Sequence, residues 1–213
     1  IEDYETLHAT RKAAPVLRLF EKLLHEHDVK SPVKVTQKDT GLRDCEVVRF
    51  RDGSIQYVAV LKEENRASPR ASDAAISLPE TTVVYDVRAG EKLGRLKNVE
   101  VTLKPGDPTL LACLPDVVES VQVEVPERVS AGGSIRVDLA LSMAGKQLAG
   151  PHCLRVEWFT PDGTAGNHYT QKIMTEEKKA AATTRLARND QPGTWKVVVT
   201  DVATGVAGEA TIE

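Results

Sequence analysis

The sequence predicts a mostly β fold, with an N-terminal helix followed by two antiparallel β-sandwiches in tandem. Three observations favour this class. A short phrase occurs twice, as DVRAG at 86–90 and DVATG at 201–205, each time directly after an apolar run typical of a strand. From Val33 onward, apolar and polar residues alternate with the period of a half-buried strand. Turns containing Gly, Pro and Asp then separate short runs of this kind to the end of the chain.

The N-terminal segment, 1–30, is predicted to be helical. Its apolar residues recur at steps of three and four, which form one face of a helix; they are Tyr4, Leu7, Ala14, Leu17, Phe20, Leu23 and Leu24. Pro15 kinks this helix or starts a second one. Ser31, which precedes Pro32, is restricted to an extended conformation, so we expect the helix to end before it.

Residues 31–115 are predicted to form the first sandwich. The expected strands are 33–36, 46–50, 55–61, 75–78, 82–87, 99–103 and 109–114. An Asp-Gly turn at 51–54 and a Pro-Gly turn at 104–107 connect two pairs of them. The polar stretch 63–73 has no period and contains Pro69, so we interpret it as an exposed loop.

Residues 116–213 are predicted to form a second sandwich, with the boundary at Pro115 and Asp116. The expected strands are 117–125, 135–141, 154–159, 168–174, 180–186, 195–200 and 208–212. Seven short strands at regular spacing are typical of an immunoglobulin-like sandwich. The Cys…Trp…Cys core of antibody domains is not present, so the label concerns architecture alone.

The repeated phrase predicts two tight structural turns. The carboxylates of Asp86 and Asp201 are expected to accept backbone N–H groups across each turn. Gly90 and Gly205 supply the positive φ that a short hairpin requires.

Composition sets broad limits on function. A hydrophobic fraction of 41% and a charged fraction of 28% are typical of a soluble globular protein. The net charge of −3 gives no electrostatic field for a nucleic-acid partner. No apolar run approaches the roughly 18 residues that cross a bilayer, so membrane insertion is not expected. The chain begins with Ile1, and we interpret it as a piece of a longer protein.

No residues predict catalysis. Glycoside hydrolysis needs two carboxylates facing each other across a cleft, whereas the adjacent acids at 63–64 and 176–177 are interpreted as solvated charges. His152 and Cys153 are neighbours in a predicted strand, where their side chains point to opposite faces, so they cannot form a nucleophilic pair. The chain is therefore expected not to be an enzyme by itself.

No metal or other cofactor is expected either. His8, His25 and His27 lie at helix spacings that do not share one metal-binding face, and His168 is a lone strand histidine. The three cysteines are far apart and odd in number, which is not a disulfide framework. Cys45 and Cys113 are interpreted as small buried residues, and a disulfide between them is the alternative.

Two binding functions remain as alternatives. Carbohydrate-binding modules usually present exposed aromatic rings, and the candidates here are Trp158, Tyr169 and Trp195. Both tryptophans lie in apolar strands and are interpreted as core residues first, with a ligand-stacking pair as the alternative. The loop 63–73 is the expected contact surface if the chain is instead a cell-surface protein-interaction module.

Several phrases in 1–115 resemble the C-terminal part of large bacterial β-galactosidase-type glycoside hydrolases. Segments 4–11, 15–24 and 29–33 are similar to the last helix of the flavodoxin-like trimerisation domain in that family. Segments 49–53, 57–61, 84–90, 103–107 and 110–115, with Gly94, are similar to the small β-sandwich that follows it. In this family the catalytic acids lie in an upstream barrel, so the resemblance assigns no catalytic residue here.

The resemblance implies a non-catalytic accessory region of a carbohydrate-active bacterial protein, used for domain packing, spacing or assembly. The implied partner is an upstream catalytic or trimerisation domain of the same polypeptide, and carbohydrate is the partner under the alternative. The second module resembles generic bacterial immunoglobulin-like or macroglobulin-type domains appended to surface and secreted enzymes. This resemblance implies an extracellular or periplasmic location.

Overall fold

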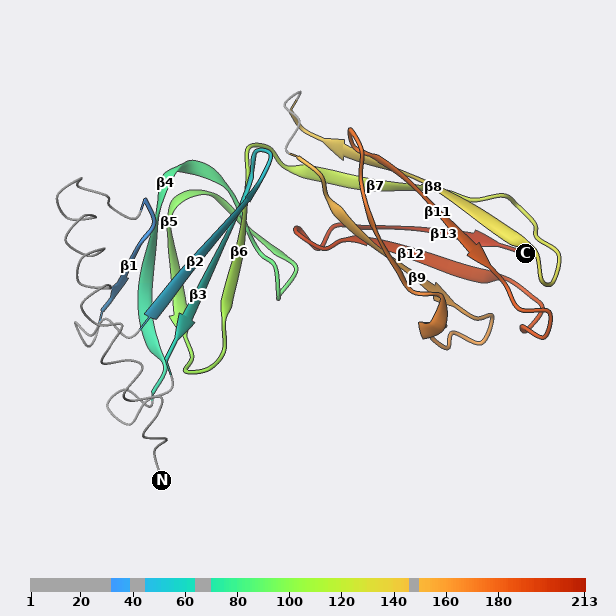
Figure 1. Ribbon diagram of the computed structural model, residues 1–213, viewed down its shortest axis with the longest axis horizontal. Helices are drawn as coiled ribbons and strands as arrows, with labels where there is room; N and C mark the ends of the chain where they lie inside the picture. Colours follow the sequence, from blue (N-terminus) through green and yellow to red (C-terminus); the bar gives the residue numbers. More distant parts are fainter. Residues whose placement is uncertain (1–31, 39–44, 64–69, 146–149) are drawn as a thin grey trace, which may run out of the picture.

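The computed structural model describes residues 32–38, 45–63, 70–145 and 150–213 (Figure 1). Within these ranges the chain forms thirteen strands, which pair in antiparallel ladders, and a single 3-10 turn. The mostly β, antiparallel class predicted from the sequence is therefore confirmed. The helix predicted for 1–30 lies outside the described residues.

The first unit is a six-stranded sheet. Its strands are β1 (Lys34–Gln37), β2 (Cys45–Asp52), β3 (Ile55–Lys62), β4 (Ser72–Asp86), β5 (Glu91–Leu103) and β6 (Thr109–Leu114). The order across the sheet is β1-β4-β6-β3-β2, and β5 lies along almost the whole length of β4. The start of β4 pairs with β1 and its end pairs with β6, so this long strand joins two parts of the sheet.

The core of the first unit lies on the inner face of this sheet. Alternation directs one residue in two inward, and the inward residues include Val58, Val60, Ala74, Ile76, Val84, Val99, Leu103, Leu111 and Cys113. Side chains from β3 and β5 share this core although the two strands are not neighbours in the sheet. The six strands are therefore hydrogen-bonded in one sheet, and side chains of its inner face form this core.

Three of the predicted elements in this unit have different bounds. The expected strands 75–78 and 82–87 are one strand, β4, whose pairing with β5 is irregular between Ser77 and Thr82. Pro79 lies in this irregular stretch, where its missing N–H costs no ladder bond. Most of the predicted loop 63–73 lies outside the described residues, and its last two positions belong to β4, which begins at Ser72. The expected strand 99–103 is the end of β5, which begins at Glu91 directly after the DVRAG turn.

The second unit consists of two facing sheets. Its strands are β7 (Val118–Glu124), β8 (Ser134–Met143), β9 (Cys153–Phe159), β10 (Gln171–Met174), β11 (Lys179–Arg185), β12 (Trp195–Asp201) and β13 (Ala207–Ile212). One sheet has the order β11-β8-β7 and the other β10-β9-β12-β13. Their inner faces share one core, which includes Ile135, Val137, Leu154, Val156, Trp158, Val197 and Val199.

The prediction that residues 168–174 form one strand is partly wrong. Residues Asn167–Tyr169 form a 3-10 turn, η1, and β10 begins only at Gln171. The amide of Gly166 donates to the Trp158 carbonyl oxygen at 2.7 Å, and the amide of Tyr169 donates to the Gly166 carbonyl oxygen at 2.9 Å. These bonds coil the chain locally and prevent strand pairing before Gln171.

Candidate functional site

The junction between the two units is an apolar contact that continues the core of the second unit. Side chains on the outer face of the first sheet belong to that core; they are Ile55, Val83, Tyr85, Ala112 and Leu114. Their immediate neighbours in β4 and β6 point to the inner core, so the last part of each of these strands is buried on both faces. Burying an apolar side chain of this size contributes about 1.5–3 kcal/mol. The contact therefore holds the two units together strongly.

The two repeated turns meet at this junction. Figure 1 shows the turn between β4 and β5 pointing toward the turn between β12 and β13. A Cβ atom added to Gly205 would lie 2.6 Å from the Cα of Gly90, so the two backbones are in direct contact. A second contact joins Gly150 to the β2–β3 turn, where a Cβ on Gly150 would lie 2.5 Å from the Asp52 carbonyl oxygen. Glycine is required at such approaches because any side chain would overlap a neighbouring backbone.

The first turn has the geometry predicted from its sequence. The Asp86 carboxylate accepts hydrogen bonds from the amides of Arg88 and Ala89, at 2.9 and 3.0 Å. The amide of Gly90 donates to the Asp86 carbonyl oxygen at 2.9 Å, and Gly90 has a φ of +67°. The side chain of Asp86 is therefore used within its own turn.

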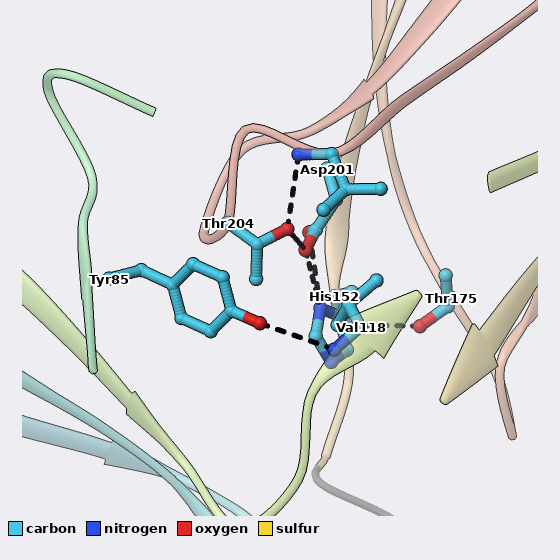
Figure 2. A network of polar contacts seen from close by, with 7 residues as sticks. Tyr85, Val118, His152, Thr175, Asp201 and Thr204 are labelled. Carbon is cyan, nitrogen blue, oxygen red and sulfur yellow. Dashed lines mark hydrogen bonds and ion pairs between the residues drawn. The ribbon is translucent and has the colours of Figure 1, made fainter. Parts of the chain in front are cut away.

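The second turn differs from the prediction in its acid. As in the first turn, the carbonyl oxygen of the Asp accepts the amide of the Gly, here from Gly205 to Asp201 at 2.8 Å, and Gly205 has a φ of +76°. Among the described residues, however, no backbone amide donates to the Asp201 carboxylate. The carboxylate instead accepts a hydrogen bond from the Thr204 hydroxyl at 2.6 Å. Both of its oxygens also lie 3.1 Å from Nδ1 of His152 (Figure 2). Asp201 thus connects the turn to β9 as well as shaping it.

The sequence excluded His152 from a nucleophilic pair with Cys153 but did not predict its partnership with Asp201. Its side chain is 1% exposed and that of Asp201 is 0% exposed. Because an ionised carboxylate can only accept, Nδ1 carries the shared hydrogen. The His152 amide donates to the Thr175 hydroxyl at 2.9 Å, which fixes the backbone just before β9. An acid at the end of an otherwise apolar strand was the one signal in the sequence, since a buried acid needs a partner.

Two tyrosines from the first unit complete the junction. The Tyr85 hydroxyl accepts a hydrogen bond from the Val118 amide at 3.3 Å, across the connection between the units (Figure 2). Burial raises the pKa of Tyr85, and the bond from Val118 acts in the opposite direction. Burial and then the negative charge of Asp201 raise the pKa of Tyr57 to about 12. Both phenols are therefore held in the neutral form.

The His152–Asp201 pair has the arrangement that orients a general base in some hydrolases. Such a base must reach a nucleophile through its second nitrogen. Within the described residues, Nε2 of His152 is buried and has no hydrogen-bond partner. Cys153 belongs to β9 with its side chain on the face away from the core, opposite to that of Leu154. The geometry therefore fits a brace for the turn that contacts Gly90.

The aromatic candidates lie away from the junction or inside the core. Trp158 is 1% exposed and its indole nitrogen donates to the Thr184 hydroxyl at 3.0 Å. Trp195 is 4% exposed and donates to the Gln191 carbonyl oxygen at 2.9 Å. Tyr169 is half-buried, lies edge-on to Trp195 with the ring centroids 6.0 Å apart, and donates to Asp190 at 2.6 Å. The two indoles are thus occupied as core side chains.

The other candidates are dispersed. The alternative of a Cys45–Cys113 disulfide is wrong, because the two residues lie opposite different ends of β3, at Lys62 and Gln56. Glu176 and Lys179 bond to each other through their backbones and close a tight turn, so the acids at 176–177 belong to that turn. In the described ranges, no three His, Cys, Asp or Glu side chains are grouped as they would be around a metal ion. No helix in the same ranges is long and apolar enough to cross a membrane.

No protein-family model matches the chain, and no curated protein resembles it significantly.

Proposed function

We propose that this chain is a non-catalytic accessory region of a larger, carbohydrate-active bacterial protein, which holds two β units at a fixed angle. The single observation that carries the proposal is the continuous apolar core across the junction. Interfaces between domains of one chain are usually more polar than permanent subunit interfaces, and the two domains are then expected to move relative to each other. Here the side chains of Tyr85 and Leu114 are buried in the core of the second unit, which favours a rigid connection between the two units. We call the two rigidly connected units the rigid bracket.

The link to β-galactosidase-type enzymes is part of the same proposal. It is supported by the order of the phrases that resemble the C-terminal region of that family. The phrase at 49–53 spans the end of β2 and its turn into β3, and the phrase at 103–107 spans the turn between β5 and β6. An upstream catalytic or trimerisation domain of the same polypeptide is the proposed neighbour.

We also propose an immunoglobulin-like topology for the second unit. The order β11-β8-β7 facing β10-β9-β12-β13 supports it, because the chain crosses between the two facing sheets after β8, after β10 and after β11. A buried tryptophan on the third strand is a feature of such domains, and Trp158 lies on β9, the third strand of this unit. The carbohydrate-binding alternative is not favoured, because the indoles of Trp158 and Trp195 are buried.

Two measurements test the proposed function. NMR relaxation should give the same rotational correlation time for amides in both units, and different times would overturn the rigid bracket. A Gly205→Val variant provides the matched comparison, since its side chain would overlap the backbone of Gly90 and should release the two units. The repurified chain should not hydrolyse chromogenic galactosides; turnover that follows the chain through repurification would overturn its non-catalytic role.

A further inference from the structure

The exposed apolar side chains of the described residues are concentrated beside the junction. Five large apolar residues are exposed: Val48, Phe50, Leu93, Met174 and Val202. Single residues of this kind are normal on a protein surface, but a group of them marks an interaction site. Leu93 lies on β5, and the other four form two patches, one on each unit.

The first patch is the outer face of β2. The side chains of Cys45 and Val47 pack against the inner core, so the even-numbered residues of this strand face outward. They are Glu46, Val48, Phe50 and Asp52. Phe50 is 59% exposed and lies directly opposite Tyr57, at the edge of the junction. The patch therefore consists of two apolar residues between two acids, and we call it the acidic patch.

The second patch is on the outer face of the β10-β9-β12 sheet. Met174, 50% exposed, lies directly opposite Cys153, whose carbonyl oxygen accepts the amide of Val202 at 2.9 Å. Two residues further along the same face, Lys172 lies directly opposite Arg155. Like charges at opposite positions destabilise a sheet unless a neighbour compensates them. This patch is an apolar row beside Lys172 and Arg155, with Glu157 two positions from Arg155 on the same face, and we call it the basic patch.

The two patches border the same junction and have opposite charge. The Asp52 carbonyl oxygen lies against Gly150, three residues before Cys153. Among the described residues, Arg155 forms an ion pair with Glu157 at 3.0 Å. Lys172, Glu46 and Asp52 form no ion pair with any residue in the described ranges. The acids of one patch and the lysine of the other are therefore available to a partner.

We propose that a second copy of this chain docks on these patches, with the acidic patch of each copy against the basic patch of the other. A two-fold axis makes this possible, because in such an interface each contact occurs twice. Phe50 and Val48 then cover Met174 and Val202, while Glu46 and Asp52 face Lys172, which lies beside the Arg155–Glu157 ion pair. The inference rests on the proposed accessory role, to which it adds a partner.

Charge complementarity is what selects a second copy as the occupant. One chain carries both an acid-bordered and a base-bordered apolar surface, so a copy supplies both of the complements that the patches need. A partner with one kind of charge would match only one patch. Residues 1–31 of the same chain, or an unrelated protein, are the other occupants that the experiment must separate.

Sedimentation velocity of the full chain, over a range of concentrations and at low and high salt, tests the proposal. The wild-type chain should self-associate, more weakly at high salt. Phe50→Ser and Met174→Ser should each raise the dimer dissociation constant at least about tenfold, since exposed aromatic and Met side chains at an interface centre dominate affinity. Leu93→Ser is the matched control, an exposed apolar residue outside both patches that should leave association unchanged.

Charge reversal identifies the pairing itself. Glu46→Lys and Lys172→Glu should each weaken association about tenfold, and the double variant should return it to within about threefold of the wild type. A chain that stays monomeric at all concentrations would overturn the proposal, as would association that these substitutions do not change. A monomer whose two units still tumble together would leave the proposed bracket function intact, so the two failures are distinguishable.

Discussion

Gly90 and Gly205 occupy equivalent places in the two repeated turns, and their backbones touch across the junction. A Cβ on Gly205 would lie 2.6 Å from the Gly90 Cα, whereas a Cβ on Gly90 would lie 3.5 Å from the Gly205 Cα. The contact is thus asymmetric in steric terms although the two phrases are nearly the same. This asymmetry leads to the first prediction.

Gly205→Ala should destabilise the protein more than Gly90→Ala. Both residues have a positive φ, +76° and +67°, which costs an L-residue about 1–2 kcal/mol. Only alanine at position 205 also overlaps a backbone, so its loss of stability should be larger. Urea unfolding measures the difference; equal losses for the two variants would show that the turns do not press together.

Removing one partner of the buried His152–Asp201 pair should lower the free energy of unfolding more than removing both partners. His152→Leu leaves a buried carboxylate with one donor fewer, and should cost about 3–5 kcal/mol of unfolding free energy. The double variant His152→Leu/Asp201→Leu should be more stable than His152→Leu, because no charge is then left without its partner. Thr204→Val, which removes the hydrogen bond to the carboxylate and the one that the hydroxyl accepts from the Val206 amide, should cost about 1–2 kcal/mol. Urea denaturation of the variants at neutral pH gives this order, and a double variant less stable than His152→Leu would contradict it.

Alkaline pH should weaken the junction through Tyr57. Its pKa is raised to about 12 in the folded chain from an ordinary value of 10.0, so the folded state keeps the phenolic proton longer than the unfolded state. The stabilisation is therefore complete below pH 10 and is lost as the pH rises from about 10 to about 12. Urea midpoints across this window should fall for the wild type and fall less for Tyr57→Phe. Absorbance near 295 nm would follow the phenol directly, and ionisation of Tyr57 at its ordinary pH would refute the prediction.

Cys113 should react with thiol reagents only when the protein unfolds. The side chain is 4% exposed, and burial raises the pKa of its thiol to about 12, so almost no thiolate is present at pH 8. Cys153 is only partly buried and serves as the internal comparison. Ellman's reagent with the wild type and Cys113→Ala would separate the thiol of Cys113 from those of Cys45 and Cys153. Fast labelling of Cys113 in the native chain would contradict its placement in the core.

Much of the fold could be predicted because alternation and turn residues act locally. The strands at 55–61 and 109–114, for example, lie within a residue of β3 and β6. Element bounds were less predictable where the surface side chains are charged, as in the first half of β5, since an exposed edge strand has no clear apolar period. The 3-10 turn at Asn167–Tyr169 was missed because it depends on a bond to the distant Trp158 carbonyl.

The candidate site was predictable only in part. The turn residues Asp86, Gly90 and Gly205 act as their sequence indicates. The role of Asp201 was incomplete in the prediction, because its main partner, His152, is separated from it by 49 positions. No periodic pattern connects residues so far apart.

The sequence by itself determined the antiparallel β class, the position of most strands and the two glycine turns, because these depend on neighbouring residues and on the period of the chain. Only the tertiary structure decided that the two turns meet, that His152 pairs with Asp201, and that the last parts of β4 and β6 are buried on both faces. The physical reason is that a pattern shows which face of a strand is apolar, but not what covers it. That depends on the packing of elements that are distant along the chain.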